Sequence, residues 1–130
     1  MPNNGEGLEA AIKGLGISVM EVKPNISYAD FSKLELRVAK VVAAREHPNA
    51  DKLLLLTIRV GEVEKQIVAG IRAHYSAESL VGRSIVVVNN LEPALIRDEE
   101  SNGMLLAASD SAGVTLLAPD RECESGAGIK

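Results

Sequence analysis

Aromatic residues are scarce in this chain of 130 residues, which has two tyrosines, one phenylalanine and no tryptophan. Its core must therefore be filled by Leu, Ile, Val and Ala, and the share of β-branched residues favours strands. The single cysteine, Cys123, cannot form a disulfide within the chain. No apolar run approaches the roughly eighteen residues of a membrane span, and the first residues, MPNNGEGLEAAIKG, lack the features of a signal peptide. We expect a cytoplasmic protein with one main domain.

Residue sets for catalysis are also missing. The two histidines, His47 and His74, are not spaced with a carboxylate pair or a nucleophile as an active site would need. A zinc site formed by these histidines and Cys123 would have scattered spacing, unlike a compact finger. No Gly-rich phosphate loop follows a predicted strand. We therefore expect a protein that is not an enzyme and that binds no metal or cofactor.

The charge of the chain is unevenly distributed. The net charge of −4 alone argues against a nucleic-acid partner. However, residues 31–91 carry nine Lys or Arg against six Asp or Glu, whereas residues 92–130 carry three against eight. This pattern fits either ordinary surface variation or a basic face for a polyanion, and charge alone leaves both open.

Alternating apolar residues predict three strands in the first half of the chain. Residues 34–38 alternate and continue through 44, with a slip near Ala39 that predicts a bulge. A second strand spans 54–60, a hairpin turn 61–64 and a third strand 65–69.

The strand pattern then breaks for a short helix over 76–80, with Ser76 as its N-cap. A buried strand over 85–88, a polar loop over 91–102, a strand over 103–108 and a short strand over 114–117 follow. This order predicts an all-β fold: a five-stranded oligonucleotide-binding (OB) barrel with a short helix between strands three and four and a C-terminal extension. Residues 28–130 form the predicted domain. Residues 1–27 form an N-terminal extension or linker, with a weak helix over 8–15.

The turn before the second strand, EHPNADKLLLL, holds a cation at the mouth of a buried strand. His47 precedes a proline and is expected to be extended. Asn49 and Asp51 can close the turn by accepting backbone N–H groups. Lys52 is then fixed from both sides. Its simpler interpretation is that it merely begins the strand.

A second stretch, ESNGM, ends the predicted loop over 91–102. Taken alone, it is a turn relieved by Gly103, with Met104 filling a gap in the core. In an OB barrel, however, this loop and the turn with Lys52 lie beside the same face, which such barrels use to bind oligonucleotides.

Several motifs together resemble the tRNA-binding domain family. They are DFSKLELRVAKVVAAREHPNADKLLLLTI (30–58), QIVAGIRAHYSAESLVGRSIVVVNNLEPA (66–94), SNGMLLAAS (101–109) and VTLLAPD (114–120). The similarity covers residues 28–130, and the motifs are specific in combination. Members of this family are free-standing dimers, C-terminal domains of methionyl-tRNA synthetases, or synthetase-associated cofactors.

The resemblance implies a non-catalytic homodimer that binds tRNA by shape and assists methionyl-tRNA synthetase, whose catalytic chain is a possible partner. Matching positions imply tRNA contacts by the following residues: Lys52, Asn90, Ser101 and Met104, with Lys40 and Arg72 at further basic positions. Members commonly have lysine where this chain has Glu92 and Leu95. They often have Gly-Val where it has Asp98 and Glu99, and usually glycine at Ala39. Arg97 is thus the remaining base of an acidic loop and a further candidate for tRNA contact, and we expect weaker phosphate binding.

Two alternatives follow from the acidic loop. One is a dimerisation or scaffold module with weakened RNA contacts. The other is a chaperone-like module that binds peptides on the same barrel. For the homodimer, the apolar residues expected to be buried against a second chain are Leu8, Ile12, Leu15, Ile17, Leu116 and Leu117. The N-terminal segment could instead cover the edge of its own barrel.

Overall fold

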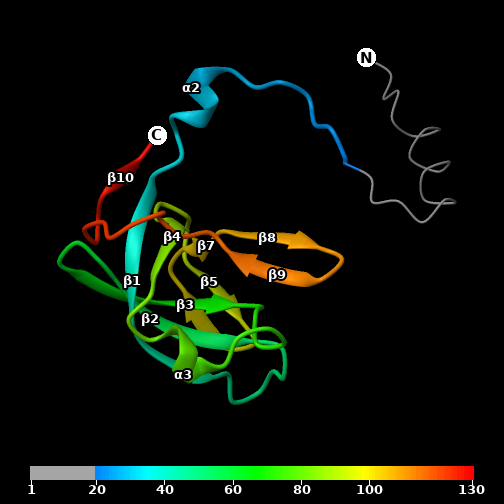
Figure 1. The fold of residues 1–130 in the computed structure, drawn as a ribbon, viewed down its shortest axis with the longest axis vertical. Coiled ribbons are helices and arrows are strands. Elements are labelled where there is room, and N and C mark those ends of the chain that lie inside the picture. Colours follow the sequence, from blue (N-terminus) through cyan, green and yellow to red (C-terminus); the bar gives the residue numbers. More distant parts are fainter. Residues whose placement is uncertain (1–19) are drawn as a thin grey trace, which may run out of the picture. The chain divides into compact units, whose positions relative to one another are not determined.

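The structure of the chain is a computed structural model that describes residues 20–130 (Figure 1). Its contacts divide the described residues into two units, a first that ends at Phe31 and a second over residues 32–130. In the first unit, α2 (Tyr28–Phe31) is a single turn capped by the Ser27 hydroxyl, which accepts the Asp30 N–H at 3.0 Å. The helix predicted over 8–15 lies outside the described residues, and the domain boundary at residue 28 stays a prediction.

The second unit is built on an antiparallel sheet with the neighbour order β3-β2-β1-β4-β7. The bounds of these strands are β1 (Leu36–Glu46), β2 (Leu54–Val60), β3 (Val63–Ala69), β4 (Ser84–Val88) and β7 (Met104–Leu105). The short helix α3 (Ala77–Leu80) lies between β3 and β4, and its N-cap Ser76 accepts the Ser79 N–H at 3.2 Å. The first four strands and the helix confirm the sequence prediction, with shifts of two residues at some ends.

The core fills the inside of the curled sheet. Because side chains alternate along a strand, each strand turns one face inward. The largest buried side chains of this core are Val41, Leu54, Leu56, Ile58, Ile67, Leu80, Ile85 and Val87, whereas Leu55, on the opposite face of β2, is buried outside it. Residues that follow β3 and β4 in the chain bond to both of these strands. Asn102 donates its backbone N–H to Gln66 O of β3 at 2.8 Å, and β7 pairs with β4. Residues 101–105 thereby link the two ends of the sheet. The fold is an all-β, OB-like barrel, as predicted.

The bulge in β1 lies later than the sequence predicts. The register shifts between Val41 and Ala43, whereas Ala39 pairs regularly with Ile85. The prediction near Ala39 is wrong because Val38 and Ala39 are both buried, although they face opposite sides of the sheet. Backbone groups of residues 126 and 127 bond to Val38 and bring the C-terminal segment against β1.

Residues 91–102 are not only a loop, which corrects the sequence prediction. They contain a hairpin of β5 (Ala94–Ile96) and β6 (Glu99–Ser101). Its two-residue turn, Arg97 and Asp98, has positive φ angles of 52° and 71°. Such turns favour Asn-Gly, so the sequence signal was absent.

The strand predicted over 103–108 is divided at Leu106. Its N–H bonds to Val86 O of β4 at 2.9 Å, and its carbonyl accepts the N–H of Leu117 at 3.1 Å. Here the chain changes partners, from β4 to its own hairpin of β8 (Ala107–Asp110) and β9 (Gly113–Leu116). This hairpin projects beside the sheet (Figure 1).

The C-terminal segment returns to the start of the sheet. β10 (Gly128–Ile129) pairs with β1, where the sequence predicted only an extension. Ser125 Oγ donates to Arg59 O at 2.6 Å and accepts the N–H of Gly61 at 3.0 Å. Gly126, with φ of 92°, passes so close that a Cβ there would lie 2.9 Å from the Gly61 backbone. The segment therefore fastens the β2–β3 turn to the edge of β1.

Candidate nucleic-acid interface

The turn over 47–53 is held by a buried histidine. His47 is 3% exposed. Its Nδ1 accepts the Asn49 N–H at 3.0 Å, and its Nε2 lies 3.2 Å from Ile96 O of β5. We assign the proton to Nε2, because one ring nitrogen must accept and the other donate. The ring closes the turn in place of the Asn49 and Asp51 side chains, which corrects the prediction, and joins it to the β5–β6 hairpin.

Arg72 holds the same turn from another side. Its Nη1 donates to Ala50 O at 3.3 Å, and its backbone N–H bonds to Lys52 O at 3.4 Å. Its Nη2 lies 3.0 Å from a Glu46 carboxylate oxygen. Arg72 was predicted to contact tRNA, but the structure gives its guanidinium two partners within the protein. Its main role in this geometry is to position Lys52.

Lys52 and Arg97 line one pocket, although they come from different loops. This cation pocket, of about 470 Å³, is lined by Asn49, Ala50, Asp51, Lys52, Leu53 and Arg97. Arg97 Nη2 donates to Asn49 O at 2.9 Å, so its guanidinium is oriented by the turn. The exposed Lys52 side chain has no hydrogen bond or ion pair with any residue of 20–130. The pocket thus presents one unpaired cation beside one oriented cation.

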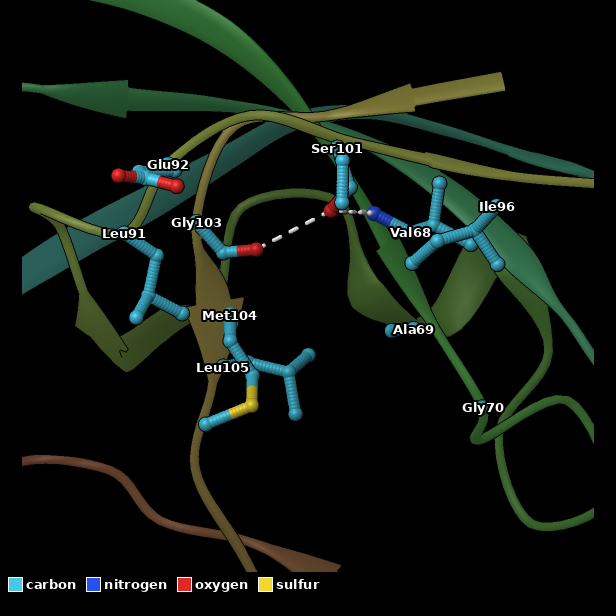
Figure 2. A pocket seen from close by; sticks show the side chains of 11 residues that line it. Val68, Ala69, Gly70, Leu91, Glu92, Ile96, Ser101, Gly103, Met104 and Leu105 are labelled. Carbon is cyan, nitrogen blue, oxygen red and sulfur yellow. Dashed lines mark hydrogen bonds between the residues drawn. The ribbon is translucent and has the colours of Figure 1, made fainter. Parts of the chain in front are cut away.

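Ser101 does not present its hydroxyl to solvent. The residue is 4% exposed, and its Oγ accepts the Val68 N–H at 2.9 Å and donates to Gly103 O at 3.1 Å (Figure 2). Gly103 has φ of 129°, and a Cβ there would lie 3.0 Å from Val88 O. Ser101 and Gly103 therefore close the barrel between β3 and β4. The single O–H of Ser101 is already used inside the barrel and its oxygen is buried, so the predicted tRNA contact has no exposed hydroxyl to rely on.

Asn90 and Lys40 lie away from the cation pocket's lining. The Asn90 amide accepts the Glu35 N–H and donates to Lys33 O, both at 2.8 Å, so it joins the end of β4 to the segment before β1. Lys40 lies opposite Arg59 of β2 on the outer face of the sheet. It makes no ion pair with the described part of the chain.

Met104 belongs to a second, apolar pocket of about 350 Å³ under the β5–β6 hairpin. The lining residues are Val68, Ala69, Gly70, Leu91, Glu92, Ala94, Ile96, Ser101, Gly103, Met104 and Leu105. Figure 2 shows Leu91, Met104 and Leu105 together on one side and Val68 and Ile96 on the other. Met104 is 48% exposed, so it does not fill a core gap. This apolar pocket adjoins the cation pocket, because a Cβ on Gly70 would lie 3.8 Å from Leu53 Cδ2.

Comparison with known proteins identifies the family. Residues 36–128 match the model of the family described as "Putative tRNA binding domain". The chain belongs to this tRNA-binding domain family. The methionine–tRNA ligase of Thermococcus onnurineus is 47% identical over 105 residues, which are 81% of this chain and 14% of that protein. The chain thus spans about one seventh of the length of such relatives.

Solved structures agree with this fold. The MetRS-related protein of Pyrococcus horikoshii is 31% identical with a TM-score of 0.76, and the match covers 85% of this chain and all of that one (100%). The chaperone CsaA of Bacillus anthracis is 32% identical with a TM-score of 0.74, and the match covers 82% of this chain and 100% of that one.

A polar cluster of the tRNA-binding domain, missed by the sequence analysis, lies next to residues 101–105, the segment that closes the barrel (the closing segment). Asn89 Nδ2 donates to Glu35 Oε2 at 2.6 Å, and Lys65 Nζ donates to Asn89 O at 3.0 Å. The Asn89 bond lowers the pKa of the Glu35 carboxyl below its usual 4.5, with Arg37 and Lys65 adding to the shift against desolvation. Burial lowers the pKa of Lys65 below 10.5, against the opposing effect of Glu35. Lys65 Nζ is 3.7 Å from where a Cβ on Gly103 would lie.

Two features are absent from residues 20–130 of the chain. Within that range, no three His, Cys, Asp or Glu side chains gather as a metal site would need. No helix in the same range is long and apolar enough to cross a membrane.

Proposed function

We propose that this chain is a non-catalytic tRNA-binding module that recognises tRNA by its shape and backbone and assists a methionyl-tRNA synthetase in the cytoplasm. The observation that carries this proposal is the cation pocket, where Lys52 is unpaired and Arg97 is oriented toward the same space. Phosphate contacts from such cations position a nucleic acid without reading its sequence. Folded RNA is recognised in this way through its backbone and surface shape.

In this proposal, the bonds that hold the turn rigid increase the affinity of the cation pocket for phosphate. Because His47 and Arg72 fix the backbone around Lys52, less conformational entropy is lost when a phosphate binds. Arg97 uses one guanidinium N–H for Asn49 O and retains others for a phosphate. Among the predicted tRNA contacts, Lys52 and Arg97 are the direct ones in this proposal, Met104 lines the adjoining apolar pocket, and Arg72, Asn90 and Ser101 act through the fold. Lys40 would contact RNA only if the tRNA also reached the outer face.

The relation to a synthetase rests on the relatives. The matched relative of Thermococcus onnurineus named methionine–tRNA ligase is about seven times as long as the matched part, and in this proposal the reaction belongs to the unmatched part. In this proposal the chain supplies tRNA affinity to a catalytic methionyl-tRNA synthetase, as one of its domains or as a partner.

Lys52→Ala tests the proposal directly. We expect tRNA affinity in a gel shift to fall severalfold, with an unchanged melting temperature, because an exposed cation contributes little to stability. The slope of log affinity against log salt should become shallower by about 0.7–0.9, the value of one phosphate contact. Arg121→Ala removes the same charge from an exposed site and is the matched control. An unchanged salt slope in Lys52→Ala would reject the phosphate contact.

The scaffold alternative is supported by the acidic residues of the segment over 91–102, Glu92, Asp98 and Glu100. It predicts negligible tRNA binding by the unmodified chain. In the tRNA-binding proposal, Glu92→Lys with Leu95→Lys strengthens an affinity that is already measurable, because both positions are exposed and gain a cation. Binding that appears only in this double variant would favour the scaffold.

The homodimer remains part of the proposal. Leu117 is 40% exposed and available for an interface, whereas Leu116 packs against its own core. The four apolar N-terminal candidates lie outside the described residues. Light scattering at micromolar concentration should give the mass of two chains, and the mass of one chain would reject the dimer.

A further inference from the structure

The closing segment contains an asparagine that is followed directly by a glycine. Among the asparagines of the chain, Asn4 and Asn102 precede glycine, and Asn102 is the one that the structure describes. Asparagine is a chemically labile residue, and glycine has no side chain to shield its backbone nitrogen. The nitrogen of the glycine can therefore reach the carboxamide of the residue before it, and Asn-Gly is the least hindered pair for loss of that amide as ammonia.

The structure leaves both reacting groups available. The Gly103 N–H donates to no acceptor among residues 20–130, although the residue is buried, whereas the Asn102 N–H bonds to Gln66 O at 2.8 Å. Buried backbone N–H groups are nearly always paired, so an unpaired one is unusual. The Asn102 residue is partly exposed, so hydroxide and water from the solvent reach its side chain. The nucleophilic nitrogen is thus not held in a hydrogen bond that its reaction would have to break.

One contact restrains the carboxamide. Asn102 Nδ2 donates to Glu100 Oε1 at 2.8 Å, and the Glu100 residue is exposed. A hydrogen bond to a carboxylate is stronger than one to a neutral acceptor, so it holds the side chain and makes its Cγ less electrophilic. This single exposed bond sets how fast the carboxamide can react.

We propose that Asn102 is a site of spontaneous deamidation in the folded domain, that Glu100 restrains the reaction, and that its product opens the closing segment. The Gly103 nitrogen forms a bond to Asn102 Cγ, the Cγ–Nδ2 bond breaks, and ammonia leaves with the Gly103 proton. Water then opens the cyclic imide at either carbonyl and leaves aspartate or isoaspartate at position 102. One ammonia is released and one water is consumed, without an oxidant, reductant or cofactor.

Either product disturbs the closure of the barrel. A carboxylate at position 102 places a second negative charge where a donor now faces Glu100 Oε1. Isoaspartate also adds a methylene to the main chain, next to Gly103, which lies so close to Val88 O that a Cβ would be 3.0 Å from it. The adjacent bond from the Asn102 N–H to Gln66 O would then weaken. The inference therefore concerns the lifetime of the closed barrel and does not depend on the proposed tRNA function.

Peptide mapping by mass spectrometry tests the site. After incubation of the folded chain at mildly alkaline pH, the tryptic peptide over 98–121 should gain the mass of an amide converted to an acid. Asn102 is the only asparagine or glutamine in this peptide, so the assignment is unambiguous. Peptides that contain Asn25, Asn49 or Asn89 should change severalfold more slowly. A sample digested without incubation gives the starting level.

A variant and a stability measurement complete the test. Glu100→Ala should accelerate the reaction severalfold, whereas Glu62→Ala, the same change in the exposed β2–β3 turn, should leave the rate unchanged. The deamidated fraction, separated by ion exchange, should melt at a lower temperature than the unmodified chain. A position 102 that reacts in the urea-unfolded chain but not in the folded one would overturn the proposal. So would an unchanged rate in Glu100→Ala, or an unchanged melting temperature of the deamidated fraction.

Discussion

The turn over 47–53 and the closing segment over 101–105 use their motif residues in opposite ways. In the turn, His47 and Arg72 make the internal bonds, and Lys52 is left unpaired at the surface. In the closing segment, Ser101 makes the internal bonds itself and is buried. Both stretches match the family, so a matched position can mark either a ligand contact or a residue that holds the barrel closed. The local bonding, and not the motif, separates these two roles.

Among the variants that test this comparison, Ser101→Ala should have the largest effect. The change leaves the Val68 N–H buried without its acceptor, so the free energy of unfolding should fall by about 1–3 kcal/mol. Urea denaturation would measure this loss. Ser109→Ala, at an exposed position of β8, is the matched control and should leave stability unchanged within about 0.5 kcal/mol. If Ser101→Ala kept full stability but lost tRNA affinity, Ser101 would be a ligand contact after all.

His47→Leu should separate the turn from the β5–β6 hairpin. It removes the bonds to Asn49 and Ile96, and we expect a loss of about 1–2 kcal/mol in unfolding free energy together with weaker tRNA binding. His74→Leu is the same chemical change at an exposed site.

A double-mutant cycle sharpens this prediction. If His47 acts by positioning Lys52, adding Lys52→Ala to His47→Leu should cost less tRNA affinity than Lys52→Ala costs alone. Fully additive effects would show that His47 influences binding independently of Lys52.

Sequence patterns predicted the elements whose signals are local. Alternating apolar residues gave β1 to β4, and Ser76 gave the start of α3. The β5–β6 hairpin was missed because a turn of Arg97 and Asp98 lacks the glycine that usually marks positive φ. β10 was missed because two residues pair with a strand near the other end of the domain.

The candidate site was predictable only in part. The resemblance selected Lys52 and Met104, and Arg97 was the base left in the acidic loop, but their arrangement in adjoining pockets depends on contacts between distant loops. The bond from the Asn49 N–H to the His47 ring is the one local signal overlooked, since it spans two residues, as side-chain turns of Asn and Asp do. The roles of Asn90 and Ser101 required knowledge of partners more than thirty residues away.

Glu35→Gln tests the polar cluster behind the closing segment through pH. The pKa of Glu35 is lowered in the folded state, so its contribution to stability is present above about pH 4.5 and is lost as pH falls through the lowered pKa. The variant should show a shallower decline of melting temperature on the acid side. Glu122→Gln, in the C-terminal segment, serves as the comparison. If the melting temperature fell equally with decreasing pH in the unmodified chain and in Glu35→Gln, this result would contradict the lowered pKa of Glu35.

Asp98→Gly is expected to have the smallest effect, on the hairpin that carries Arg97. Because Asp98 has φ of 71°, glycine should relieve strain while losing some chain entropy, for a net gain of about 0.5 kcal/mol or less. Removing this carboxylate should also raise tRNA affinity slightly at low salt. A clear loss of stability would show that the Asp98 side chain supports the turn.

The pairing of β10 with β1 has a consequence for how the domain folds. The first strand of the barrel receives part of its edge from residues 126–129, so that contact cannot form until nearly all of the domain has been synthesised. Until then, the beginning of β1 exposes unpaired backbone groups that could pair with another chain. Closing such a long loop is a slow step in folding, because its entropy is lost before the contact forms. Although β1 is the first strand of the barrel to be synthesised, the backbone groups at its beginning are thus the last to be paired.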